Sequence, residues 1–449
     1  MRIFSRPQAN INQLIFSYMN YFTRNFLLIF GYSLMILFVS CGPADKKWKG
    51  QEPIQKVDTR TRPIQYQLKQ TYNLGNGIFI SNDFDGARMN GVALTANDEI
   101  TVLITPENTP INESPWYAFK IWSNTPKKIH LKITYPEGVS HRYYPKISNN
   151  GKSWNAVDSA SYHIDARPAK RQESPKFCAI DLQISKDTTW VAAQEIITST
   201  DINLWAKHLA SKPFVLLEQL GKSKNGRTID LLQIGNPESK KLILVLSRQH
   251  PPEVTGWLAM KAFVERLCAE DDSSKLFRNE YCTFVVPCLN PDGVDNGHWR
   301  HSAAGIDLNR DWEAFNQPET QAIRKFMQDK VLKGNKFYFS IDFHSTFQDI
   351  YYTMAPELQG NMPGLVPKVI QAMANDIPGY DPNVRPNEID AIRINSTVSI
   401  FHAFHAEAVT YEVGDNTPRE LIKTKGELTA KNLISIMLAD EKEVATVKK

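Results

Sequence analysis

The chain has 449 residues, of which 42% are hydrophobic and 22% are charged, and its formal net charge is +4. This composition is ordinary for a folded protein, and the length is sufficient for two or three domains. Because the net charge is small for this length, the composition gives no reason to expect a nucleic acid as a partner.

The N-terminal segment has the pattern of a targeting sequence. Arg24 precedes an apolar run over residues 26–39, which is shorter than the roughly 20 residues of a membrane-spanning helix. Cys41 follows after one small residue, and this order resembles a bacterial lipoprotein signal, in which the cysteine carries lipid. We therefore predict such a signal over residues 1–41, with Met19 as an alternative start. The other interpretation is an N-terminal anchor helix. Either one places the rest of the chain in the cell envelope, facing the periplasm or the exterior.

The cysteines do not form a recognisable disulfide framework. Cys282 and Cys288 flank the extended run TFVVP, which holds them too far apart to bridge each other, whereas a bond between Cys268 and Cys282 stays open. No Cys-x-x-Cys pair is present, so the sequence does not indicate a thiolate zinc site.

The first half of the chain reads as a linker followed by a β-rich region. Residues 42–70 are polar and contain many Lys, Gln and Pro residues, as linkers do. Over 71–192, short runs of alternating apolar and polar residues are separated by turn signals, with no helical pattern between them. This pattern predicts an antiparallel β-sandwich domain. Its clearest strands contain Ile100, Val102 and Ile104, and then Ile129, Leu131 and Ile133.

The second half, residues 198–440, alternates buried strands with helices. Continuous apolar runs, typical of strands covered on both faces, occupy 242–246, 283–287, 337–343 and 408–413. One helical pattern between them contains Trp257, Met260, Val264 and Leu267. Another begins near Pro318 and places Ile323, Phe326, Met327 and Val331 on one face. We expect an α/β catalytic domain with a mixed, largely parallel sheet flanked by helices.

Candidate metal ligands follow the strands of this second region. His250 and Glu253 come directly after the run 242–246, and His344 ends the run FYFSIDFH. The spacing of three residues puts the first two side chains on one face of a turn, and two imidazoles with one carboxylate suit a zinc ion that keeps a position for water. Taken singly, His250 could instead cap a helix, and His402 with His405 offers a competing ligand spacing.

Other hydrolase signatures are absent from the sequence. There is no His-Glu-x-x-His, which excludes the common helical arrangement of zinc proteases, and no Gly-x-Ser-x-Gly, which leaves serine hydrolysis without a candidate nucleophile.

Several motifs, in one order, resemble the zinc carboxypeptidases of family M14. They are HPPE, NPDGV, WRHS, GIDLNRDW, FHS and YEVGD, and the resemblance covers about residues 200–435. The preceding β-rich segment, with ESPWYAFKIW and HRYYPKISNNGKSW, resembles the N-terminal domain of the cytosolic-carboxypeptidase branch and its bacterial relatives. The better-known carboxypeptidases have a mobile tyrosine on a loop well before the catalytic glutamate, and this sequence departs from that pattern, because the only tyrosine in its corresponding stretch is Tyr411, adjacent to Glu412.

The resemblance assigns the metal site to four residues. It makes His250, Glu253 and His344 the ligands of one zinc ion, and it makes Asp307 the carboxylate that orients His250.

The resemblance also assigns four residues to catalysis and substrate binding. Glu412 becomes the general base and then the general acid, and Arg300 stabilises the oxyanion that develops on the scissile carbonyl. Asn309 and Arg310 bind the terminal carboxylate of the substrate.

These assignments predict a zinc-dependent metallocarboxypeptidase that acts on peptides with a free C-terminal carboxylate and is held at the membrane by a lipid or an N-terminal anchor. One alternative is a zinc amidase acting on peptidoglycan peptides or acylated amino acids. A second alternative is a non-catalytic surface protein that binds peptide or glycan.

Overall fold

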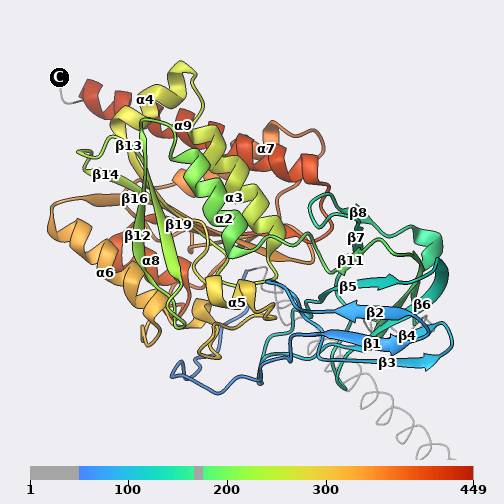
Figure 1. Cartoon of the computed structure of the whole chain (residues 1–449). Helices are drawn as coiled ribbons and strands as arrows, with labels where there is room; N and C mark the ends of the chain where they lie inside the picture. The colour runs from blue at the N-terminus through green and yellow to red at the C-terminus, as the bar shows by residue number, and fades with distance from the viewer. Residues whose placement is uncertain (1–49, 166–174, 448–449) are drawn as a thin grey trace, which may run out of the picture. The chain divides into compact units, whose positions relative to one another are not determined.

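The computed structural model describes residues 50–165 and 175–447, which belong to one compact unit (Figure 1). The predicted lipoprotein signal, with Cys41, and residues 42–49 of the predicted linker lie outside the described residues. Within the described ranges, no helix combines the length and the apolar character needed to cross a membrane.

The β-rich region contains two sheets. The six-stranded sheet has the order β1 (Thr71–Gly75), β2 (Ile78–Ser81), β5 (Ala118–Ser123), β11 (Thr189–Ala192), β7 (Lys146–Ser148) and β8 (Asn155–Ala156). The five-stranded sheet has the order β3 (Gly91–Ala96), β4 (Glu99–Leu103), β6 (Lys127–Thr134), β10 (Phe177–Ile184) and β9 (Tyr162–Ile164). Alternate residues of β6, namely Ile129, Leu131 and Ile133, are buried, as the alternating pattern predicted, and they share one core with residues of the other sheet.

One strand pair differs from the predicted antiparallel arrangement. Strands β4 and β6 are parallel, with Ile100 opposite Leu131. The chain between them passes through β5 in the other sheet, so that it returns to the first sheet in its original direction. Every other neighbouring pair in these two sheets is antiparallel.

The rest of the described chain is built on an eight-stranded mixed sheet. Its order is β12 (Val215–Lys222), β13 (Thr228–Gly235), β15 (Cys282–Val286), β14 (Lys241–Ser247), β16 (Lys336–Thr346), β19 (Glu407–Gly414), β17 (Ile350–Thr353) and β18 (Val384–Pro386). The central strands β15, β14, β16 and β19 are parallel, whereas β12, β13 and β17 introduce antiparallel pairs. The sheet is therefore mixed, as predicted.

Helices cover both faces of this sheet (Figure 1). One face packs against α2 (Ser199–Leu209), α3 (Val254–Leu267), α4 (Asp272–Glu280), α7 (Leu365–Asn375) and α9 (Arg419–Val447). The other packs against α6 (Pro318–Leu332) and α8 (Ser396–Phe404). Strand β14 contributes Ile243 and Val245 to the first core and Leu242, Leu244 and Leu246 to the second, which explains its continuous apolar run.

The buried face predicted for α3 is confirmed in full, and the one predicted for α6 only in part. All four predicted core residues of α3 are buried. In α6, which begins at Pro318 as expected, Ile323 and Met327 are buried but Val331 is exposed. Each step of four residues rotates the side chain by about 40° on a helix of 3.6 residues per turn, so a series of such steps leaves the buried face.

The described part of the predicted linker lies against the folded regions. Thr59 is buried and its hydroxyl donates to Asp311, and the backbone N–H of Gln65 donates to the Glu107 carbonyl. Nothing in the structure tests the domain boundaries, which remain predictions. Cys178, Cys268, Cys282 and Cys288 are buried free thiols, so the bond between Cys268 and Cys282 that the sequence left open does not form.

Candidate metal centre and cleft

The candidate residues gather at the carboxyl ends of the central parallel strands. Strand β14 leads to His250, β16 contains His344, and β19 contains Glu412. Strands β16 and β19 are parallel neighbours, with His344 opposite Glu412 in the register. In open α/β sheets this end of the strands is where ligands bind, so the topology brings residues that are far apart in sequence to one place.

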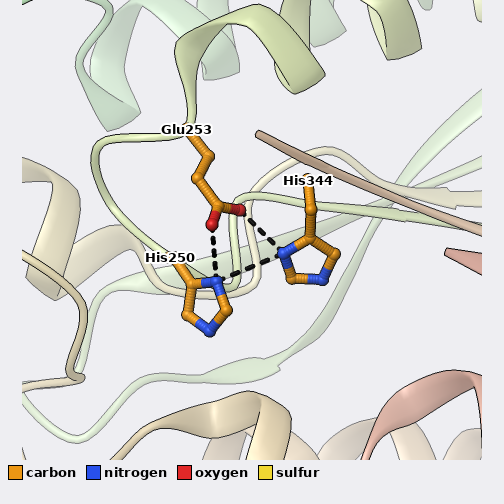
Figure 2. A group of neighbouring side chains, drawn as sticks. All are labelled: His250, Glu253 and His344. Carbon is orange, nitrogen blue, oxygen red and sulfur yellow. Dashed lines mark hydrogen bonds and ion pairs between the residues drawn. The ribbon is translucent and has the colours of Figure 1, made fainter. Parts of the chain in front are cut away.

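Three side chains from two of these strand ends converge on one point (Figure 2). The Nδ1 atom of His250 lies 2.8 Å from one carboxylate oxygen of Glu253, and the Nδ1 atom of His344 lies 2.7 Å from the other. The two Nδ1 atoms are 3.2 Å apart. All three residues are buried, and among the described residues they form the one group of histidine, cysteine or carboxylate side chains close enough to share a metal ion.

The opposite edge of each imidazole is tied to a carboxylate. The Nε2 atom of His250 is 2.9 Å from Asp307, which is the partner that the resemblance assigned to it. The Nε2 atom of His344 is 2.9 Å from Asp342, a residue that sequence reasoning missed. The signal was present, because residues two apart on a strand project to the same face. With Nε2–H donating to a carboxylate, Nδ1 is left as a lone-pair donor toward the shared point.

This donor set fits zinc. Two ligand atoms that are each ~2.0–2.1 Å from a tetrahedral zinc ion stand about 3.3 Å apart, and the observed separation of the two Nδ1 atoms is 3.2 Å. Two neutral imidazole nitrogens and one carboxylate also form the three-ligand set that zinc enzymes use when one position stays open.

The local backbone conformation places the three candidate ligands close to one another. Arg248 adopts a left-handed conformation with φ of 52°, which turns the chain away from β14 just before His250. Glu253 is the N-cap residue of α3, but its side chain makes no capping hydrogen bond and points to the two histidines instead. The first turn of α3 packs on β16 at Gly256, where a Cβ atom would lie 2.4 Å from the His344 carbonyl oxygen.

Glu412 presents a free carboxylate oxygen beside the candidate metal ligands. Its Oε2 atom is buried and has no hydrogen-bond partner in the described part of the chain. Burial raises the pKa of Glu412 to about 7. A carboxylate with an uncommitted oxygen at this place can take up and release a proton.

Arg300 is joined to the metal site through Asp307. Its Nε–H donates to Oδ2 of Asp307 at 2.7 Å, while Oδ1 of the same carboxylate faces His250. Asn309 lies beside them, with its Oδ1 accepting from the Ser396 backbone N–H. Arg310 is half-buried, and its Nη1 donates to the Asn309 carbonyl.

Most of these groups line one cleft, whereas His344, Asp307 and Asp342 lie behind its lining. Its lining includes His250, Glu253, Arg300, Asn309, Arg310 and Glu412. The β-rich region contributes Arg142, whose guanidinium bonds Asp415 through Nε at 2.7 Å and Nη2 at 3.2 Å. A tyrosine also reaches the cleft, but it is Tyr352 from β17 rather than a residue of the loop before Glu412. Tyr411 is buried, and its hydroxyl bonds Asp349 instead.

The competing histidines lie elsewhere. His402 is on α8 and His405 is its C-cap, and neither lines the cleft. Two other histidines flank Arg300 in the sequence: the Nδ1 atom of His298 bonds the His301 carbonyl, and that of His301 bonds Asn108.

Part of the chain is similar in sequence to known peptidases. Residues 202–367 match the sequence profile of the zinc carboxypeptidases, peptidase family M14. The chain is 24% identical to human cytosolic carboxypeptidase 2 over 297 residues, which is 60% of this chain and 33% of the human protein. It is 27% identical to an uncharacterised protein of Zymomonas mobilis over 260 residues, 55% of this chain and 63% of that protein. The chain therefore spans only part of the length of these relatives.

Solved structures share the fold. A metallo-carboxypeptidase from Burkholderia cenocepacia superposes with a TM-score of 0.66 at 20% identity, over 81% of this chain and 99% of that chain. One from Pseudomonas aeruginosa, in complex with (2-guanidinoethylmercapto)succinic acid, gives a TM-score of 0.63 at 20% identity, over 80% and 98%. Residues 198–440 make up little more than half of the chain, so these matches extend beyond the eight-stranded sheet and its helices.

Proposed function

The chain carries a zinc carboxypeptidase domain of family M14, as its motifs predicted, and on this premise we propose that it hydrolyses the C-terminal peptide bond of peptides. The observation that carries the proposal is the convergence of His250, Glu253 and His344 beside the uncommitted oxygen of Glu412. A metal site and a proton acceptor in one cleft are the equipment of metal-assisted hydrolysis.

His250, Glu253 and His344 would hold one zinc ion. When bound, zinc supplies Lewis acidity, which lowers the pKa of water from 15.7 to about 7 and polarises a carbonyl group. Asp307 and Asp342 keep both Nδ1 atoms directed inward by accepting the Nε2–H protons on the far side of each ring.

Glu412 performs the proton transfers. Its Oε2 atom accepts the proton of the attacking water and then delivers it to the nitrogen of the departing amino acid. The raised pKa suits both steps, because a group that titrates near neutral pH can serve as base and as acid.

Two further groups bind and stabilise the substrate. Arg300 donates to the oxyanion that develops on the scissile carbonyl, and Asp307 orients it for this role. Arg310 and Asn309 bind the terminal carboxylate, because a guanidinium and an amide N–H together match its two oxygens. Such a pair selects for exopeptidase action, since an internal peptide bond offers no carboxylate at that position.

The test is zinc content together with hydrolysis of an N-blocked dipeptide. The wild type is expected to bind one zinc ion per chain and to release the C-terminal amino acid. Glu412→Gln should keep the zinc and lose at least about 100-fold in kcat, within the range for a lost acid–base group. The exposed Glu265→Gln variant on α3 is the matched control and should retain full activity. Zinc-free wild-type protein, or an active Glu412→Gln variant, contradicts the proposal.

The amidase alternative uses the same groups, because Asn309 and Arg310 fit any substrate with a free carboxylate. A panel of peptides, acylated amino acids and peptidoglycan peptides, read by mass spectrometry, separates the two. Release of single C-terminal residues from unmodified peptides supports the carboxypeptidase, and cleavage restricted to the other two classes supports the amidase. Zinc-free and inactive protein would instead support a binding module.

We also propose that the chain is anchored in the cell envelope by lipid on Cys41. The support is the order of a basic residue, a short apolar run and this cysteine. Radiolabelled fatty acid fed to cells should label the wild type and not Cys41→Ser. Equal labelling of both, or a full-length N-terminus in the mature protein, refutes the anchor.

A further inference from the structure

Glu107 belongs to the β-rich region but contacts the segment that carries Arg300. It lies between β4 and β5, is fully buried, and is absent from the lining of the cleft. Its carboxylate accepts three backbone hydrogen bonds, from Trp299 N–H at 2.8 Å, Arg300 N–H at 3.0 Å and His301 N–H at 2.7 Å. Three consecutive N–H groups that point at one carboxylate define the course of that backbone.

The Arg300 segment has no regular secondary structure of its own. It connects the short helix α5 (Pro291–Asp295) to the 3-10 turn η2 (Leu308–Arg310), and no strand or helix hydrogen bonds hold residues 299–301. The three hydrogen bonds to Glu107 take the place of the backbone hydrogen bonds that a strand or helix would provide. They matter for the cleft because the Arg300 side chain projects from this backbone to Asp307.

Neighbouring contacts strengthen the same attachment. The Trp299 indole is buried in the core of the β-rich region, and its Nε1–H donates to the Trp116 carbonyl at 3.1 Å. Asn108 bonds Nδ1 of His301 at 2.6 Å and donates to the Gly305 carbonyl at 3.1 Å. Every one of these contacts joins the β-rich region to residues on either side of Arg300.

The electrostatic surroundings keep Glu107 ionised. Burial alone would raise its pKa, but His298, Arg88 and His301 face it and lower the pKa to about 2. Arg88 is itself buried, with its Nε–H donating to the Thr105 carbonyl. An ionised carboxylate makes stronger hydrogen bonds to N–H groups than a neutral one, which suits a group that has to hold a loop in one conformation.

From this geometry we propose that Glu107 is a positioning residue for Arg300, through which the β-rich region sets the oxyanion-stabilising guanidinium of the cleft. The inference rests on the proposed function, because it takes the role of Arg300 from there. It gives the β-rich region a part in catalysis without any group that touches the substrate.

The test is a double-mutant cycle on the full chain, with zinc content and the rate of dipeptide hydrolysis as readouts. Glu107→Gln keeps the size of the side chain but replaces one acceptor oxygen by an N–H donor, which opposes the loop N–H groups. We expect kcat to fall by about 10- to 100-fold, as for a catalytic group displaced by about 1 Å, with KM changed less than threefold and zinc content unchanged. In the Arg300→Gln background the same substitution should change kcat by less than about twofold, because two residues that act as a unit are not additive.

A control separates positioning from stability. Asn82→Ala removes a buried side chain of the β-rich region whose amide group bonds the Gln67 side chain and the Leu68 and Met89 carbonyls rather than residues 299–301. It should lower the unfolding temperature and leave kcat within about twofold. If Glu107→Gln does not fold, Asn108→Ala replaces it in the cycle, with an expected loss of about threefold to tenfold in kcat that likewise vanishes in the Arg300→Gln background.

Two outcomes overturn the proposal. Unchanged kcat in Glu107→Gln would show that Arg300 does not depend on it, and equal losses in both backgrounds would show that Glu107 acts on the fold as a whole. An inactive wild type would instead refute the proposed function, and this inference with it. The wild-type rate therefore tells the two failures apart.

Discussion

Asp342 Oδ2 lies 2.9 Å from Nε2 of His344, two residues further along strand β16. The same oxygen accepts from the Gln249 side chain and from the Ser396 hydroxyl, so its position is set by three donors. The strand thus carries both a candidate metal ligand, His344, and the carboxylate that orients its imidazole. The geometry of the candidate metal site therefore depends on a residue that is not one of its three candidate ligands.

Asp342→Asn is expected to weaken zinc binding by about 10- to 100-fold, the usual effect of losing the carboxylate behind a ligand histidine. Asparagine keeps the volume of the side chain but removes the negative charge that makes the imidazole a stronger electron-pair donor to zinc. Competition with a chromogenic chelator measures the dissociation constant. The exposed Asp390→Asn serves as the control, and equal affinities in the two variants would argue against this role.

Asp307→Asn is expected to damage two properties together, because the carboxylate bonds both His250 and Arg300. Zinc affinity should fall by about 10-fold or more, and kcat of the zinc-saturated protein should fall as well. Arg300→Gln is the matched comparison. It should reduce kcat by about 100- to 1000-fold with unchanged zinc affinity. If Arg300→Gln lost as much zinc affinity as Asp307→Asn, the prediction that Arg300 affects kcat without affecting zinc binding would be wrong.

Gly256→Ala is expected to lower the free energy of unfolding of the metal-free protein, prepared with a chelator, by about 1–3 kcal/mol, because overpacking a core costs this much. The new Cβ atom would meet the His344 carbonyl at 2.4 Å, and neither backbone can yield without moving the helix from the strand. Urea unfolding measures the change. Gly91→Ala, where a Cβ atom would meet only the Leu103 side chain at 3.6 Å, provides the control and should stay within about 0.5 kcal/mol. Similar midpoints for both variants would count against the close approach.

Glu319 should make stability fall as pH rises. Its Oε2 atom is buried and has no hydrogen-bond partner in the described part of the chain. Burial raises the pKa of Glu319 from 4.5 to about 7, and the nearby carboxylates of Asp292 and Asp311 add to this rise. Between these two values the folded state holds a proton that the unfolded state has lost. The stabilisation is therefore complete below pH 4.5 and disappears as pH rises through 7.

Glu319→Gln removes this titration. Its oxygen can still accept from the Lys224 backbone N–H, so the variant is expected to be more stable than the wild type at pH 8 and to lose the advantage at pH 4.5. Thermal unfolding of the chelated protein at several pH values measures the difference, with the exposed Glu313→Gln as the reference. A constant difference between variant and wild type across this range would exclude the titration.

Much of the second half of the chain could be predicted because its signals are local. The apolar runs at 242–246 and 337–343 are strands since both of their faces are buried, and the spacing of Trp257, Met260, Val264 and Leu267 marks the buried face of α3. The resemblance to the zinc carboxypeptidases also followed from the motifs, and residues 202–367 match the sequence profile of that family. Val331 shows where the predicted face was drawn too long, because repeated steps of four residues rotate away from the buried face of a helix.

The sequence by itself determined which residue types stand at the strand ends, because a histidine three residues before a glutamate and a histidine after an apolar run are features of neighbouring residues. Only the tertiary structure decided what surrounds them. Three features join parts of the chain that no periodicity connects. They are the parallel pairing of β4 with β6, the position of Tyr352 in the lining of the cleft, and the hydrogen bond from the Arg300 backbone N–H to Glu107. Glu107 and Arg300 are nearly two hundred residues apart, and they meet because the β-rich region packs against the loop that carries Arg300. Contacts of that kind depend on the packing of whole elements, which no window of sequence contains.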